Sequence, residues 1–458
     1  MKPTYEELEA TIEKQNKIIE VLTSKIADLE SQLRKNSKNS SKPPSSDQKS
    51  NSPQSQKQDS RSFHPGASRQ LLPESVVTSQ EDRVMNSCPR CRSSMIATGE
   101  VVKWQQVELP EIKPLVHQWN LHVCQCPNCH LVATPELQST ERYLMGPRLE
   151  ALTNLCLGRF RMGHQVVREF LCTLIPIFKA SQGLISKIKK RAAQALASPH
   201  QQIMEKILQL EAPLHADATG WRHKGINEHA IVTRVANWVA FHFVRHLNKA
   251  VFKNLLPRKR LHIVSDRGLP VSEVEARIHQ YCLAHLLRNL QGLAEHPATT
   301  IEETELIGNI HDSIQQLFID KHRLVLGEIS VSTWRQYGYR IWQHIEELVE
   351  DALENGLSKK VARALRRMQK GWKHFKAYLQ RPDYPMTNNL AEESLRSLVI
   401  ARKLCFGSRS DYGRAWRAQI QSCIETLHRQ GRSLLDFITD ALRASRCGST
   451  SPDICALN

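Results

Sequence analysis

The sequence predicts an α/β protein whose strand-rich region lies in the second half of the chain, behind three smaller segments. Two observations carry this prediction: an apolar heptad and paired cysteines mark the N-terminal part, and β-branched runs that end in acidic residues begin after Glu211. The chain has 458 residues, enough for about three domains. Its 63 Lys and Arg against 46 Asp and Glu give a formal charge of +17, which favours a polyanionic partner, above all nucleic acid.

Membrane insertion and export are not expected. The most apolar stretch, Ala230 to Val244, contains Arg234, and no window approaches the roughly 18 apolar residues of a spanning helix. The N-terminal string MKPTYEELEA lacks the apolar core of a secretory signal. We therefore expect a cytoplasmic protein with no membrane partner.

Residues 1–34 are predicted to form a coiled-coil dimerisation helix. Apolar residues recur at alternate spacings of three and four, which places them on one helix face. They are Tyr5, Leu8, Ile12, Ile19, Leu22, Ile26, Leu29 and Leu33, with Gln15 as the polar exception. The alternative is an amphipathic helix that packs on its own protein. Residues 35–82 are predicted to be a disordered polar linker, because Lys35 to Ser62 includes no hydrophobic residue.

Residues 83–135 are predicted to bind one structural Zn²⁺. The ligands would be two pairs of cysteines, each with two residues between them, in a closed tetrahedral site: Cys88, Cys91, Cys126 and Cys129. The gap between the pairs is longer than usual, and Cys124 or His130 could replace one ligand. Val116 to His122 alternates apolar and polar residues and predicts a half-buried strand. The alternative is a set of reduced structural cysteines without metal.

Residues 140–209 have a helical pattern, and a helix-turn-helix-like DNA-binding segment is predicted there. Ser181 to Arg191 forms a helix with a capping serine at its start. Its polar face carries three basic residues that we expect to contact DNA: Lys187, Lys190 and Arg191. The alternative is an ordinary solvated helix face.

The strand-rich region begins at residue 210. Ala230 to Asn237 and Trp238 to His246 are predicted strands, and Lys249 to Leu256 is a predicted helix. Asp217 and Asp266 each end an apolar run, which suggests two carboxylates at one edge of a sheet. Glu392, in the first turns of a predicted helix, is a third candidate. Such oxygens suit Mg²⁺, although an acid at a strand end is often only a turn residue.

Six strings of sequence resemble the transposases of the insertion-sequence sixty-six family, and together they cover nearly the whole chain. They are KPPSSD at 42–47, HADATGWR at 215–222, SDRG at 265–268, YCLAHLLRNL at 281–290, NNLAEESLRSLVIARK at 388–403 and SCIETLHRQGRSLLDFI at 422–438. The paired CPxC knuckles also resemble that family.

The resemblance implies a ribonuclease-H-like catalytic domain over residues 210–420 with a DDE triad of Asp217, Asp266 and Glu392. It implies two Mg²⁺ per active site, hydrolysis at the ends of a mobile element, and transfer of the freed 3′-OH into target DNA. Cys282 and His285 match a C-x-x-H near the site. The implied partners are double-stranded DNA (element ends and target), a second copy or higher oligomer, and possible accessory proteins, in the nucleoid of a bacterium.

The sequence departs from the family pattern at two positions. Ala218 stands where an acidic residue usually follows the first Asp, and Glu393 stands where an Arg usually follows the catalytic Glu. These changes would favour an inactive relic that only recognises element ends. A further alternative is a metal-dependent nuclease that cuts without joining.

Between Asp266 and Glu392 the sequence predicts a helical insertion at about 286–385. Its last part, Lys359 to Arg381, has nine basic residues and no acidic one, with three aromatic residues interleaved. We expect this stripe to bind DNA phosphates through residues such as Lys373 and Lys376, and its aromatics to stack on bases; the alternative places those aromatics in the core. Three basic residues around the catalytic Glu would hold the scissile phosphate: Arg396, Arg402 and Lys403. A C-terminal helix and tail would occupy 421–458.

Overall fold

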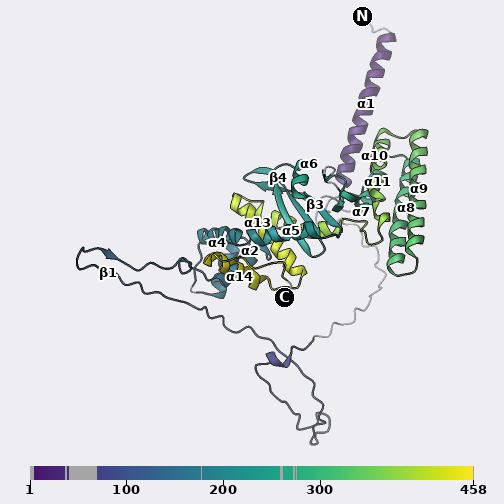
Figure 1. Cartoon of the computed structure of the whole chain (residues 1–458). Coiled ribbons are helices and arrows are strands. Elements are labelled where there is room, and N and C mark those ends of the chain that lie inside the picture. The colour runs from purple at the N-terminus through teal and green to yellow at the C-terminus, as the bar shows by residue number, and fades with distance from the viewer. Residues whose placement is uncertain are drawn as a thin grey trace. The chain divides into compact units, whose positions relative to one another are not determined.

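The computed structural model describes residues 5–36, 39–40, 70–176, 178–257, 261–271, 274 and 276–456. The chain divides into two units (Figure 1): Met1–Gln48 with Trp119–Asn458, and Lys49–Gln118. Most of the predicted polar linker lies outside the described residues. Among the described residues, no helix combines the length and the apolar character that crossing a membrane would need.

A five-stranded mixed sheet forms the centre of the larger unit, so the predicted α/β class is confirmed. Its strands are β3 (Leu214–His223), β4 (Ile226–Val235), β5 (Trp238–Val244), β6 (Leu261–Ser265) and β7 (Ala276–Tyr281), in the order β5-β4-β3-β6-β7. β3, β4 and β5 run antiparallel, whereas β6 is parallel to both β3 and β7. The sequence analysis located β4, β5 and β6 but missed β7.

Side chains from helices form hydrogen bonds with backbone groups of both edge strands. On β5, the N–H groups of Val239 and Phe241 donate to hydroxyls of Thr426 (3.1 Å) and Ser422 (2.9 Å) on α13 (Asp411–Arg429). On β7, the carbonyl of His279 lies 3.1 Å from Nδ1 of His374 on α11 (Trp372–Phe375). Buried backbone groups that would otherwise lack a partner are thereby satisfied.

Helices that precede, interrupt and follow the strands in the sequence pack with the sheet in one apolar core. They are α2 (Pro147–Gly158), α3 (His164–Leu174), α4 (Gln182–Ala195), α5 (Ala197–Gln209), α6 (Lys249–Leu255), α13 and α14 (Leu434–Cys447). The predicted cap of α4 is confirmed, because the Ser181 hydroxyl accepts from the N–H of Leu184. The predicted boundary at residue 420 falls inside α13.

The segment between β7 and α12 (Asn389–Cys405) is helical and has a core of its own. It contains α7 (Leu283–Ala294), α8 (Ile301–Val325), α9 (Val331–Asn355), α10 (Lys359–Gln369), α11 and the short 3₁₀ helix η3 (Ala377–Gln380). Phe375 and Tyr378 are buried in this core and Trp372 packs against it. The expectation that the stripe's aromatics stack on DNA bases is therefore wrong for Phe375 and Tyr378, whose rings are needed for packing.

The N-terminal segment is a single helix, α1 (Tyr5–Arg34), as its heptad predicted. Its apolar residues are exposed over most of its length; Ile19, for example, is 58% exposed. Near its end, Asp28 forms an ion pair with Lys360 (2.7 Å), and its Oδ1 lies 3.3 Å from Nε2 of His296. A partner for the exposed stripe stays a prediction.

The strand predicted over residues 116–122 is wrong. These residues are extended without strand pairing, and Val116 is 78% exposed, so their alternating pattern has no neighbouring strand to pack against. A shorter pair forms just beyond: β1 (Cys124–Gln125) and β2 (Val132–Ala133) run antiparallel and flank the second cysteine pair.

Candidate active site and cysteine knuckles

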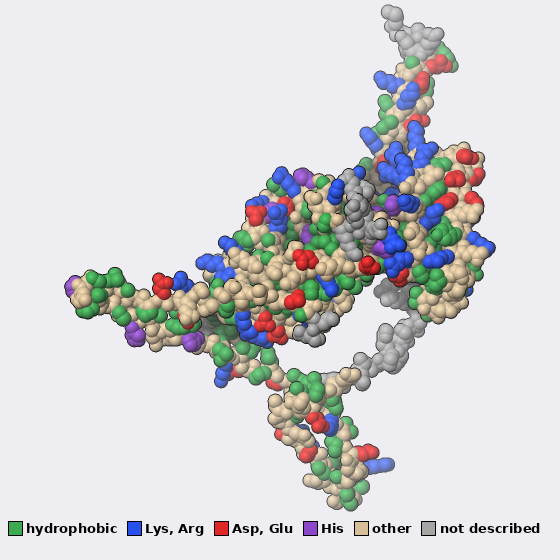
Figure 2. Space-filling view, viewed as in Figure 1, with side chains coloured by type: hydrophobic (Ala, Val, Ile, Leu, Met, Phe, Trp, Pro, Cys, Tyr) green, Lys and Arg blue, Asp and Glu red, His purple; other side chains and the backbone are tan. Residues whose placement is uncertain are grey.

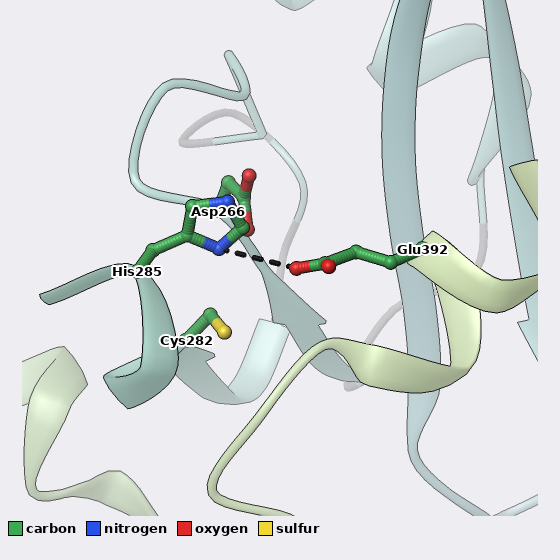
Figure 3. Close-up of side chains that lie close together, drawn as sticks. All are labelled: Asp266, Cys282, His285 and Glu392. Carbon is green, nitrogen blue, oxygen red and sulfur yellow. Dashed lines mark ion pairs between the residues drawn. The ribbon is translucent and has the colours of Figure 1, made fainter. Parts of the chain in front are cut away.

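Three side chains from separate elements point toward one another at the end of the parallel strands (Figure 3). Asp266 directly follows β6, His285 lies in the first turns of α7, and Glu392 lies in the first turn of α12. Nδ1 of His285 is 2.7 Å from Oδ1 of Asp266 and 3.4 Å from Oε1 of Glu392. With Sγ of Cys282, these ligand-type atoms all lie within 4.8 Å of one another.

Asp217 lies beside this cluster but within β3, paired with Val232, so the expectation that it ends a strand is wrong. Burial, and then the negative charges of Asp266 and Glu392, raise the pKa of Asp217 to about 7. Like charges disfavour ionisation only when they are near, so all three sequence-predicted carboxylates share one electrostatic environment. The Ala218 N–H donates to the Asp217 carboxylate (2.7 Å) and opposes this shift.

The cluster leaves two buried polar atoms without satisfactory partners. Oδ1 of Asp266 and Nδ1 of His285 are close, yet neither has a partner with hydrogen-bond geometry. Burial by itself would lower the pKa of His285, but its contacts with Asp266 and Cys282 outweigh burial and raise the pKa to about 10. A gathering of carboxylates with orphaned donor and acceptor atoms fits a divalent cation.

Two further residues, absent from the predicted site, support Glu392. Arg288, three residues after His285 on α7, lies 3.1 Å from Oε1 of Glu392. Asn388, fully buried before α12, donates from Nδ2 to the carbonyl of Ala216 (2.8 Å), and its Oδ1 is 3.3 Å from Nδ1 of His215. The backbone N–H of Asn388 donates to Sγ of Cys282 (3.2 Å). Asn388 thus ties the start of α12 to both β3 and α7.

Glu392 and its neighbour Glu393 point to different surroundings. Glu393 pairs with Arg234 on β4 (2.9 Å) and Arg429 on α13 (3.2 Å). These guanidinium partners offset the burial of Glu393 and hold its pKa below the usual value. Of the two glutamates, Glu392 is therefore the one that joins the cluster with Asp266.

The predicted DNA-binding residues divide into exposed side chains and half-buried side chains that make internal contacts. Lys187, Lys190, Lys373 and Arg396 are exposed, and Lys403 is exposed at the end of α12. Three others make internal contacts: Arg191 with Glu150, Lys376 with Glu346, and Arg402 with the Thr219 hydroxyl (3.1 Å) and the Gly220 carbonyl. The engaged residues hold α4, α11 and α12 in place.

Each predicted zinc knuckle has the same local backbone. In the first, Cys88 N–H donates to the carbonyl of Ser93 (2.8 Å) and Arg92 N–H to that of Cys88 (2.9 Å). In the second, Cys126 N–H donates to Leu131 (2.8 Å) and His130 N–H to Cys126 (3.0 Å). Arg92 and His130 both have left-handed backbones, with φ of 63° and 56°.

Hydrogen bonds within the knuckles favour the thiolate that binds metal. Those from Ser93, and then from Cys88, lower the pKa of Cys91 to about 7. Backbone N–H groups of Cys129 and Asn128 lower the pKa of Cys126. A thiolate is the form that coordinates Zn²⁺, so each knuckle by itself is arranged as a half-site. The four-cysteine site stays a prediction, because the two knuckles belong to different units.

Carboxylates gathered beside a sheet, in a chain with a formal charge of +17 and with Lys and Arg side chains gathered over α10 (Figure 2), are typical of proteins that process nucleic acid. A comparison with protein families gives the specific result: the model described as Transposase IS66 family matches residues 178–415. The chain belongs to this family and is a transposase, as the motifs indicated. A second model, described as a family of unknown function (DUF6444), matches residues 1–70. No curated protein matches the chain.

Proposed function

We propose that this transposase cuts the ends of its element and joins them to target DNA, with Asp217, Asp266 and Glu392 as its catalytic triad. The observation that carries the proposal is the meeting of Asp266, at the end of β6, and Glu392, on α12, at His285, with Oδ1 of Asp266 and Nδ1 of His285 left without hydrogen-bond partners. Asp217 on β3 is near enough for the charges of both carboxylates to raise its pKa. The mixed sheet, with three antiparallel strands followed by two parallel ones, supports a ribonuclease-H-like domain.

The proposed chemistry has two phosphoryl transfers. In the first, the oxygen of water bonds to phosphorus and the bond from phosphorus to the 3′ oxygen breaks, which frees a 3′-OH. In the second, that 3′-OH attacks a target phosphodiester and displaces another 3′ oxygen. Asp217, Asp266 and Glu392 would hold Mg²⁺, which, when bound, polarises the attacking and leaving oxygens.

The chain's own residues orient this site. His285 and Arg288 place positive charge against Glu392, and Asn388 fixes the first turn of α12 relative to β3. The pairing of Glu393 with Arg234 and Arg429 leaves Glu392 free to face Asp266, which favours an active enzyme over a relic. Arg396 and Lys403, exposed on the same helix, would contact the DNA backbone.

The other proposed parts assemble and stabilise the enzyme. Cys88, Cys91, Cys126 and Cys129 would bind one structural Zn²⁺, consistent with the shared backbone of the two knuckles. The exposed stripe of α1 would pair with a second copy, since an isolated helix with such a stripe gains stability when another helix covers it. The proposed partners are DNA at the element ends and at the target.

The decisive experiment uses DNA that carries the ends flanking this gene, incubated with the full chain, with and without Mg²⁺. We expect joined product with Mg²⁺, and none from Asp217→Asn, Asp266→Asn or Glu392→Gln, each of which removes an anionic ligand with little change of shape. End binding should persist. Glu393→Gln is the matched control and should remain active, because its side chain faces Arg234 and Arg429.

Each other outcome contradicts a particular part of the proposal. Cut DNA without joining would make the protein a nuclease, and binding without cutting would make it a relic. An inactive Glu393→Gln beside an active Glu392→Gln would overturn the choice of the third ligand.

A further inference from the structure

The turn that follows α12 presents an exposed aromatic ring on a strained backbone. Phe406, the residue directly after α12, is 79% exposed. Its backbone is left-handed, with φ of 55° and ψ of 19°. Helices that end in this conformation usually have glycine there, because a Cβ makes it unfavourable. A ring that is exposed at a strained position adds little to the core, so its presence indicates a role outside the fold.

Contacts with the end of β3 hold this turn in place. The Ser408 N–H donates to the carbonyl of Arg222 (2.8 Å), and the Lys224 N–H donates to the carbonyl of Ser408 (2.9 Å). Gly407, with φ of 110°, allows the two segments to approach, since a Cβ at this position would collide with the carbonyl of Arg222. The ring of Phe406 therefore stands on a backbone that is fixed to the central sheet.

One face of α12 leads from the proposed active site to this ring. A helix of about 3.6 residues per turn places Arg396 and Lys403 within roughly 40° of Glu392 around its axis, and both basic side chains are exposed. Phe406 follows Lys403 by three residues, and the exposed Arg409 comes three residues later. A DNA strand whose scissile phosphate lies at Glu392 would therefore meet positive charge along α12 and then the aromatic ring.

We propose that Phe406 inserts its ring at a base step of the element end and packs against the unstacked base, with Lys403 and Arg409 at the flanking phosphates. Apolar side chains that enter a duplex in this way unstack and kink it, and nearby cations hold its backbone. Packing of a ring on a base requires no particular sequence. The inference rests on the proposed function, which it deepens by naming a residue that distorts the DNA near the cut.

Two elements give the same spacing between the ring and the chemistry. Along α12, the fourteen positions from Glu392 to Phe406 cover roughly 21 Å at about 1.5 Å each. Along β3, the five positions from Asp217 to Arg222 cover roughly 17 Å at about 3.3 Å each. With about 3.4 Å between successive base pairs, the distorted step lies about five to six base pairs from the scissile bond.

The first test separates a role on DNA from a role in folding by thermal unfolding of the full chain without DNA. We expect Phe406→Gly to melt at or above the wild-type temperature, because glycine adopts the left-handed backbone readily and the lost ring is exposed. Phe406→Ala, which keeps the Cβ, should melt close to the wild type. A large drop in both variants would show that the ring packs in the fold, and would overturn the proposal.

The second test measures binding of a 40-base-pair end duplex as a function of salt. Phe406→Ala and Phe406→Gly should bind roughly tenfold more weakly, with an unchanged slope of log K against log salt, because the ring carries no charge. Arg409→Gln should instead reduce that slope by about 0.9.

Two variants control this measurement. Phe406→Tyr keeps an aromatic ring and should restore most of the affinity that alanine loses. Tyr339→Ala removes another exposed aromatic side chain, on α9, and should bind like the wild type. Wild-type affinity of Phe406→Ala would overturn the proposal.

The third test locates the contact with permanganate, which oxidises thymine bases that are unstacked. With the wild type bound, a thymine placed about five to six base pairs from the cut should become reactive. With Phe406→Ala bound, it should stay as unreactive as in the free duplex.

Each other outcome has a defined meaning. Thymines that stay unreactive throughout an end that the wild type binds and cuts would overturn the contact, while the transposase function stands. If Phe406→Ala leaves the thymine reactivity unchanged but lowers the mass measured by light scattering, the ring binds a second copy and the proposal is wrong. A wild type that neither binds nor cuts end DNA contradicts the proposed function as well.

Discussion

The structural dependence of the site on Asn388 can be measured directly by an Asn388→Ala variant. The change removes a fully buried carboxamide and leaves two buried groups unpaired, the carbonyl of Ala216 and Nδ1 of His215. Burial lowers the pKa of His215 to about 4, so at neutral pH its ring is neutral and loses one ordinary hydrogen bond. At roughly 1–3 kcal/mol for each unsatisfied group, we expect a loss of about 3 kcal/mol.

The assay is unfolding of the catalytic region in urea, with hydrogen exchange or fluorescence as the readout. For an m-value of about 3 kcal/mol/M, the midpoint should fall by roughly 1 M. Cleavage should fall by about 10²-fold or more in the remaining folded enzyme, because a small displacement of α12 moves Glu392 out of position. The exposed neighbour provides the matched control: Asn389→Ala should change stability by less than about 0.5 kcal/mol. Equal stability and activity of the two variants would refute this reasoning.

Two other predictions concern the N-terminal half. Elemental analysis should find one equivalent of zinc per chain, lost in Cys88→Ser or Cys126→Ser with local unfolding near the knuckles and an intact catalytic fold; a zinc-free wild type would contradict the site. Deletion of residues 1–34 should lower the mass measured by light scattering and weaken complexes that pair two ends, while binding of a single end is spared. A truncated chain that still dimerises would show that α1 is not the dimerisation element.

Local sequence patterns predicted the elements whose signals are local. The heptad of α1, the serine cap of α4 and the strand-end position of Asp266 all depend on nearby residues, and the structure has each of them. Residues 116–122 show the limit of this approach, because alternation indicates a strand only if a partner strand is available. β7 was missed because Ala276–Tyr281 mixes polar and apolar residues without strict alternation.

Long-range contacts could not be read from the sequence in the same way. Nothing near Arg191 in the sequence indicates that Glu150 neutralises it. Likewise, Asn388 was visible only as part of a motif, while its contact with Ala216 spans 172 residues. The three carboxylates were chosen by resemblance, and their proximity depends on a sheet that joins distant strands.

The occupied edges of the central sheet have a consequence for how two copies can meet. A bare edge strand would let the sheet of one molecule extend into the sheet of another, a route to uncontrolled polymers. Here the backbone groups of Val239 and Phe241 on one edge and His279 on the other are already engaged by side chains of the same chain. Strand addition at these positions would have to break those bonds. A second copy could therefore extend this sheet only by displacing side chains of α11 or α13 from the edge that it joins.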